Sequence, residues 1–98
     1  MERRLGFVGI VVDDKNVASE SINRTLSQHA DLIAARLGIP NVQGDACVIT
    51  LVVRATSDEV GRLTGKLGML DGVQVKSALA KTVSGASLPE SQSKEGRR

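Results

Sequence analysis

The chain has 98 residues, of which 41% are hydrophobic and 24% charged, as expected for one small globular domain. Its formal net charge of +2 comes from interspersed acidic and basic residues, a balance that does not predict binding to nucleic acid or to an anionic membrane. No run of 18 or more apolar residues is present, so no membrane-spanning helix is expected. The single cysteine, Cys47, cannot form an internal disulfide, and we therefore expect a reducing, cytoplasmic compartment.

The first third of the chain predicts a strand followed by a helix. Residues 4–12 are rich in Val, Ile and Phe, which is typical of a strand. A polar turn follows, in which Asp14 is a candidate helix cap. From residue 17 to residue 35 the apolar residues recur at steps of three and four, which predicts a helix whose apolar stripe includes His29.

The middle of the chain predicts a weak strand and then a strong one. Gly38 is expected to end the preceding helix, and Pro40 allows only an edge strand or a loop. We therefore expect a short, irregular strand near residues 39–42. The segment 46–55, ACVITLVVRA, is the second strong strand of the chain.

The last third predicts a helix, a strand and a tail. A Thr or Ser cap followed by acidic residues opens a helix at residues 56–59, and the helix is expected to run to about residue 70. After an Asp-Gly turn, residues 73–81 alternate between apolar and polar as a strand does. The composition changes after Val83, so we predict a domain over residues 1–83 and a disordered tail over residues 84–98.

This order of elements, strand-helix-strand-strand-helix-strand, predicts an α+β fold of the ferredoxin-like βαββαβ type. In that fold two helices cover one face of a four-stranded antiparallel sheet.

The two strong strands are apolar on both faces, which predicts a second cover for the sheet. Residues 4–12 place Leu5, Phe7, Gly9 and Val11 on one face and Val8, Ile10 and Val12 on the other. Residues 46–53 divide in the same way, into Cys47, Ile49, Leu51 and Val53 against Ala46, Val48, Thr50 and Val52. A sheet with helices on one side normally alternates with polar residues. Either some apolar surface stays exposed or a second copy of the chain covers it, and we expect a homodimer or higher homo-oligomer.

Three glycines interrupt the second predicted helix, although each costs roughly 1 kcal/mol relative to alanine. On a helical wheel Gly61, Gly65 and Gly68 lie within about 60° of one another, opposite the leucines that must face the sheet. They should therefore open outward, beside Thr64. Such a strip lets a small ligand or another backbone approach closely. The alternative is a loose surface helix that frays at Gly68.

No complete constellation for catalysis or metal binding is apparent. His29 is the only histidine, and as a metal ligand it would need Cys47, carboxylates or another subunit to complete a site. Cys47 falls on an apolar alternation, which favours an inert buried thiol. Asp13 and Asp14 could be paired acids or hard-metal ligands, although a polar turn also explains them. We therefore predict a protein that is not an enzyme and uses no cofactor.

Three segments resemble the family of iron-only hydrogenase system regulators: RLGFVGIVVDD (4–14), HADLIAARLGIP (29–40) and DEVGRLTGKLGMLDGVQVKSALAK (58–81). The resemblance covers roughly residues 3 to 82. It implies an ACT-like domain, related to the regulatory half of the nickel-responsive repressor, with a transcriptional or maturation role in a hydrogenase system. Direct DNA binding is not expected, because no ribbon-helix-helix segment precedes Arg4.

The resemblance also implies a small effector bound at a subunit interface near the first strand–helix turn. The predicted ligand- or partner-binding residues are Asp13, Asp14, Gly61, Thr64, Gly65 and Gly68. The alternative is a scaffold that oligomerises or docks on a partner protein and binds no ligand.

Overall fold

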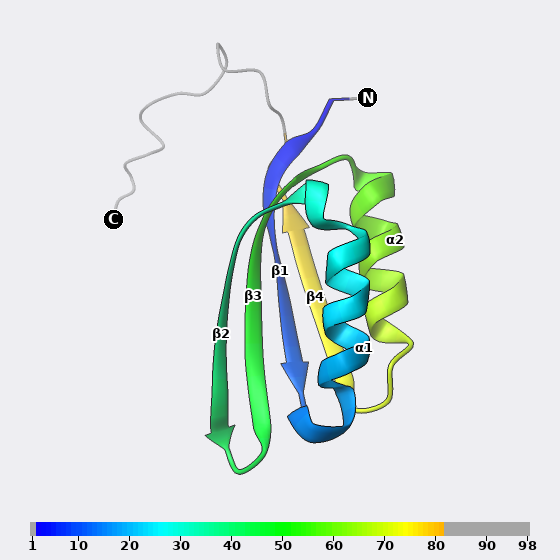
Figure 1. The fold of residues 1–98 in the computed structure, drawn as a ribbon. Helices are drawn as coiled ribbons and strands as arrows, with labels where there is room; N and C mark the ends of the chain where they lie inside the picture. Colours follow the sequence, from blue (N-terminus) through cyan, green and yellow to red (C-terminus); the bar gives the residue numbers. More distant parts are fainter. Residues whose placement is uncertain (1, 82–98) are drawn as a thin grey trace, which may run out of the picture.

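The computed structural model describes residues 2–81, which form one layer of sheet and one layer of helices (Figure 1). The tail predicted for residues 84–98 lies outside the described residues. The elements are β1 (Arg4–Val12), α1 (Lys15–Gln28), the 3-10 turn η1 (Ala30–Leu32), β2 (Ile33–Gln43), β3 (Ala46–Ala55), α2 (Ser57–Gly68) and β4 (Val73–Leu79). The antiparallel sheet has the order β2-β3-β1-β4, and both helices cover the same face. The predicted ferredoxin-like arrangement is confirmed.

Both helices begin at capping side chains that the sequence supplies. The Asp14 carboxylate accepts a hydrogen bond from the Asn16 backbone N–H at 2.9 Å. At α2 the Thr56 hydroxyl accepts from the Glu59 N–H at 3.1 Å, while the Glu59 carboxylate accepts from the Thr56 N–H at 2.8 Å. These reciprocal bonds are a capping box, and they satisfy backbone donors that a helix start leaves without partners.

The Glu59 carboxylate also joins the N-terminal segment to the helical layer. The Arg3 guanidinium donates to both Glu59 oxygens, at 3.1 and 2.9 Å, and to Asp31 at 3.2 Å. These bonds from Arg3, followed by the backbone bond from Thr56, lower the pKa of Glu59 to about 2. The charged form of Glu59 therefore stabilises the native protein.

This shift predicts a pH dependence of stability. The pKa of Glu59 falls from 4.5 to about 2 on folding, so the carboxylate's contribution is present above pH 4.5 and is lost as the pH falls towards 2. Glu59→Gln should be less stable than the wild type at neutral pH and should lose less further stability between pH 5 and pH 2. Urea unfolding followed by circular dichroism across this range would measure both slopes. Parallel slopes would contradict the role given to Glu59.

The core between the sheet and the helices is entirely aliphatic apart from one thiol. Inward residues of β1 and β3 meet the apolar stripes of α1 and α2; those at 2% exposure or less are Val8, Ile10, Val12, Ile22, Leu51, Val53, Ala55, Leu63 and Leu67. The division of the strands into two faces is therefore as predicted. The only aromatic residue, Phe7, lies on the opposite face and is 53% exposed.

The prediction for residues 29–42 is wrong in detail. α1 ends at Gln28 instead of residue 35, and His29 caps it, with its backbone N–H donating to the Leu26 carbonyl at 3.1 Å. The chain then makes the η1 turn and enters β2, an 11-residue strand and not a short one near residues 39–42. Gly38 does not end a helix, because it lies inside β2 opposite Ile49.

β2 can accommodate Pro40 because it is an edge strand of the sheet. Its pairing with β3 shifts register between Ile39 and Gln43, and Asn41 there has a left-handed φ of 56°. Nearly all of its residues are exposed. An edge strand with little burial shows no clean alternation of apolar and polar residues, which is why the sequence pattern underestimated its length.

α2 ends at Gly68, two residues before the predicted end, and a turn leads into β4. Gly72 in this turn has a φ of 74°, a conformation that favours glycine. Its carbonyl accepts a hydrogen bond from the Asp13 N–H at 2.8 Å, which ties the β1–α1 and α2–β4 turns together. Within residues 2–81, neither helix has the length and apolar character needed to span a membrane.

Candidate functional site

The glycine strip of α2 faces outward, as predicted. A Cβ built on Gly61, Gly65 or Gly68 would meet no atom within 4 Å outside the helix's own backbone. Thr64 is half-buried beside the strip, and its hydroxyl donates to the Gly61 carbonyl at 3.4 Å. Within a single chain the glycines therefore relieve no crowding, and their cost in helix stability is not offset by any contact of the described residues.

Substituting a glycine of this open strip distinguishes an unused surface from a binding surface, because the two interpretations predict opposite effects of an added methyl group. If nothing packs there, Gly65→Ala should raise the free energy of unfolding by up to about 1 kcal/mol, because alanine has the higher helix propensity. If a ligand or another chain uses the strip, the added methyl should weaken that association. Denaturant unfolding together with sedimentation would separate the two. A more stable and equally assembled variant would remove the strip as a functional site.

The predicted acids of the β1–α1 turn have structural roles. Asp14 caps α1, and the Asp13 backbone is bonded to Gly72. The Asp13 side chain is exposed and lies close to Gly72, where a Cβ would meet Asp13 Cβ at 3.6 Å. A polar turn at a strand end therefore accounts for both residues.

His29 lies at the end of α1, half-buried, and not within a helical stripe. Its Nε2 atom has no hydrogen-bond partner among the residues described. Burial lowers the pKa of His29, and the nearby positive charge of Lys66 lowers it further. No cluster of three or more His, Cys, Asp or Glu side chains suited to a metal ion occurs within residues 2–81.

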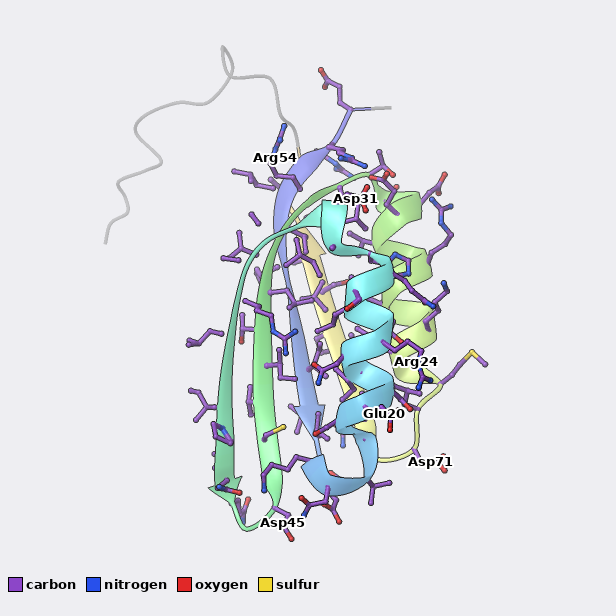
Figure 2. The ribbon with its side chains drawn as sticks, in the orientation of Figure 1. Glu20, Arg24, Asp31, Asp45, Arg54 and Asp71 are labelled. Carbon is purple, nitrogen blue, oxygen red and sulfur yellow. The ribbon has the colours of Figure 1, made fainter. Side chains whose placement is uncertain are left out.

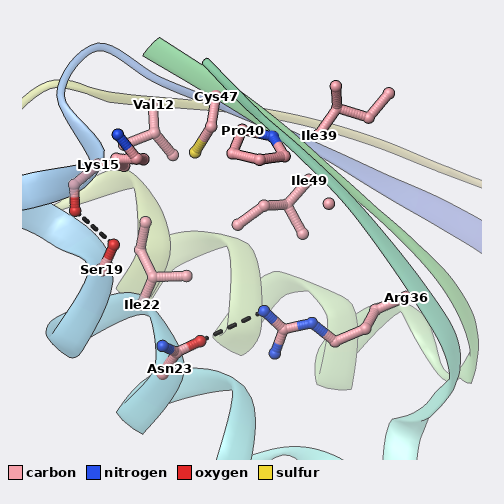
Figure 3. A pocket seen from close by; sticks show the side chains of 11 residues that line it. Val12, Lys15, Ser19, Ile22, Asn23, Arg36, Ile39, Pro40, Cys47 and Ile49 are labelled. Carbon is pink, nitrogen blue, oxygen red and sulfur yellow. Dashed lines mark hydrogen bonds between the residues drawn. The ribbon is translucent and has the colours of Figure 1, made fainter. Parts of the chain in front are cut away.

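The structure contains a hollow that the sequence did not predict, here called the α1–β2 cavity (Figure 3). It lies between α1 and the inner face of β2, and its volume is about 230 Å³. Aliphatic side chains of Val12, Ile22 and Ile49 line it together with the Cys47 thiol. Its polar lining residues are Lys15, Ser19 and Asn23 from α1 and Arg36 from β2. The six residues predicted as a binding site do not line it.

Hydrogen bonds position the polar side chains of the α1–β2 cavity. The Arg36 guanidinium donates to the Asn23 amide oxygen at 3.2 Å, across the opening from β2 to α1 (Figure 3). Lys15 Nζ donates to the Asn41 amide oxygen at 2.7 Å and lies 3.6 Å from the Asp45 carboxylate. The Ser19 hydroxyl donates to the Lys15 carbonyl.

One signal in the sequence could have indicated this cavity. Lys15, Ser19 and Asn23 recur at steps of four, so they form a polar row along one side of α1. Arg36 falls between the helix expected to end at residue 35 and the strand expected near residues 39–42, so the sequence did not indicate that it faces this row. Cys47 was correctly expected to be buried, at 8% exposure.

The outer face of the sheet is a second candidate site, and side chains project from it away from the helices (Figure 2). Adjacent strands place Phe7 opposite Val52, and Ile39 opposite Val48, on this face. Its large exposed residues are Leu5, Phe7, Val11, Leu37, Ile39 and Val52, each 43–64% exposed. This patch, the outer apolar face, confirms that β1 and β3 are apolar on both faces, while β4 places Gln74 and Lys76 on the outer side of the sheet.

Comparisons with known proteins agree with this fold. The chain is similar over 82% of its length to the whole of TM1266 from Thermotoga maritima, with 35% identity and a TM-score of 0.76. It is also similar to the ACT domain of the GTP pyrophosphokinase of Chlorobium tepidum, with 23% identity over 78% of this chain and 99% of that domain, at a TM-score of 0.66. The C-terminal domain of MgtC from Mycobacterium tuberculosis matches at 17% identity and a TM-score of 0.64, over 82% of this chain and 90% of that one.

At 23% and 17% identity the last two likenesses show the fold alone, which is ACT-like. No curated protein gave a significant match. A family model matches residues 4–77, and its description, iron-only hydrogenase system regulator, names a role and not a measured activity. This match, which spans most of the chain, and the identity to TM1266 show that the chain belongs to the TM1266-like family of iron-only hydrogenase system regulators.

Proposed function

We propose that the chain is a non-catalytic regulatory module that acts as a homo-oligomer, joined through the outer apolar face, and that responds to a small ligand. The family description and the ACT-like fold support a regulatory role. The observation that carries the proposal is the outer apolar face itself. Contiguous apolar surface of this kind is uncommon on monomers and is typical of interfaces.

The outer apolar face is large enough to form the centre of a dimer interface. Its residues lie on β1, β2 and β3, and three strands about 4.8 Å apart, each rising about 3.3 Å per residue, give a flat area of roughly 400 Å². A standard interface buries about 800 Å² of accessible surface on each partner, and side-chain relief adds to the flat area. The proposed partner is a second copy of the chain, because a two-fold axis lets the outer apolar face of one copy pack against the same face of the other.

The test is the state of assembly of the wild-type protein. Sedimentation velocity at micromolar concentration should give a dimer or a larger species. A wild-type monomer at that concentration would overturn the proposal. The compartment that we propose is the reducing cytoplasm, in which the Cys47 thiol stays free, and direct contact with DNA is no part of the proposed function.

The second candidate is a scaffold that assembles or docks without any ligand. The outer apolar face favours it as well, because assembly through that face requires no small molecule. Thermal unfolding with candidate ligands separates the two functions, since a ligand specific for the native state stabilises it by mass action.

A further inference from the structure

We propose that the α1–β2 cavity binds a small aliphatic carboxylate that has no ammonium group. This inference rests on the proposed function, since it names the class of ligand to which the module would respond. It assigns the ligand to a cavity within one chain, away from the glycine strip of α2.

The lining requires a ligand with an apolar body. Val12 and Ile22, at 0% and 2% exposure, lie behind the lining, and the apolar surface that a ligand could reach comes from Ile49 and Cys47, each 8% exposed, and from the exposed Pro40 of β2. A fully hydrated inorganic anion would gain little binding free energy from contact with this apolar lining. The volume of about 230 Å³ lies below the usual range for small-molecule pockets, roughly 300–1,000 Å³, which points to a ligand of a few carbons.

The charge of the cavity suits a monoanion. Lys15 lies 3.6 Å from the Asp45 carboxylate, which offsets its charge. Arg36 is exposed, and no carboxylate of the described residues lies within 4 Å of it, so its guanidinium is open to an anion from solution. Asn23 accepts one guanidinium N–H and steadies the side chain across the opening. A guanidinium has five N–H donors, so enough remain to bind a carboxylate with two parallel bonds.

The lining contains no group that would neutralise an ammonium ion. Among residues 2–81, no Asp or Glu side chain lines the α1–β2 cavity, and the Asp45 carboxylate is 62% exposed beside Lys15. A bound amino acid would therefore bring an unpaired positive charge next to Arg36, at a cost in desolvation and repulsion. The cavity should discriminate between an aliphatic acid and the amino acid of the same carbon skeleton.

Cys47 gives one of two readouts of occupancy, because it lines the cavity at 8% exposure and is the only thiol of the chain. The probe is isovalerate at millimolar concentration, compared with neutral isovaleramide and zwitterionic leucine. Isovalerate should slow the alkylation of Cys47 by iodoacetamide and shift the methyl NMR signals of Ile22 and Ile49. Isovaleramide and leucine should do neither.

Two variants and one control test whether isovalerate binds in the α1–β2 cavity. Arg36→Gln should weaken isovalerate binding about tenfold or more, because it removes charge-assisted hydrogen bonds. Gly38→Val should block the cavity without altering its charge, since a side chain at Gly38 would point towards Ile49. Arg24→Gln is the matched control, because Arg24 lies on α1 outside the cavity and pairs with Glu20 at 3.2 Å. It should bind isovalerate as the wild type does.

The proposal is overturned if isovalerate leaves Cys47 alkylation and the methyl signals unchanged, or if leucine or isovaleramide acts as well as isovalerate. It is also overturned if folded Arg36→Gln and Gly38→Val, checked by circular dichroism, both bind isovalerate with wild-type affinity. Sedimentation of the same samples tests the proposed assembly separately from the proposed ligand class. An assembled protein that ignores isovalerate would refute the ligand class alone, whereas a monomer would refute the proposed assembly.

Discussion

Val52→Asp is expected to convert the assembled protein into monomers or aggregates. Val52 lies on β3 opposite Phe7, within the outer apolar face, and is 45% exposed in a single chain. In a monomer the new carboxylate would be hydrated and tolerated. In the proposed oligomer it would be buried without a partner, at a cost of about 3 kcal/mol or more, which corresponds to a loss of affinity of more than about a hundredfold. Sedimentation velocity at the concentration where the wild type is assembled measures this loss.

Val17→Asp is the matched control for that experiment. Val17 is 72% exposed in the first turn of α1, on the helical layer and away from the outer apolar face. An acidic residue in the first turn of a helix is favourable, so this variant should fold and assemble as the wild type does. Equal assembly of the Val52 and Val17 variants would show that the outer apolar face is not the interface.

Leu63→Ala is expected to destabilise the fold by about 2–5 kcal/mol, the usual cost of truncating a buried leucine. Leu63 is 0% exposed and lies on the side of α2 that faces the sheet. The total stability of a small domain is about 5–15 kcal/mol, so this one change would remove a large part of it. The measurement is the free energy of unfolding from a urea titration.

Met69→Ala provides the comparison for Leu63. Met69 follows α2 as its C-terminal cap and is 83% exposed. It loses a side chain of similar size without opening a cavity, so the free energy of unfolding should change by less than about 0.5 kcal/mol. Similar losses for the two variants would contradict the assignment of the leucine side of α2 to the core.

The strong local signals of the sequence predicted most of this fold. β1 and β3 have the predicted bounds because runs of Val and Ile fit a strand whose two faces are both apolar. The start of α2 was predictable because a capping box depends on residues three apart in the chain. In both cases the residues that determine the element lie close together in the sequence.

The path from α1 into β2 could not be predicted in this way. Ile33 continues the spacing of the α1 stripe, yet it pairs with Val53 as the first residue of β2. The residues around Ile33 do not distinguish a continued helix from a strand, because the outcome depends on contact with β3, twenty residues away in the chain. The α1–β2 cavity was missed for the same reason. Arg36 meets Asn23 only after β2 has paired along its length, so the site is a product of the tertiary fold.

The position of Phe7 determines what optical spectroscopy can detect in this protein. Near-ultraviolet circular dichroism usually distinguishes a packed native core from a molten globule through the fixed environment of aromatic rings. This chain has one Phe and no Tyr or Trp, and the Phe7 ring lies outside the core. A near-ultraviolet signal would therefore report the surroundings of the outer sheet face, and the core could loosen without altering it directly. The order of the core is therefore better followed through the NMR signals of its methyl groups than through an aromatic ring.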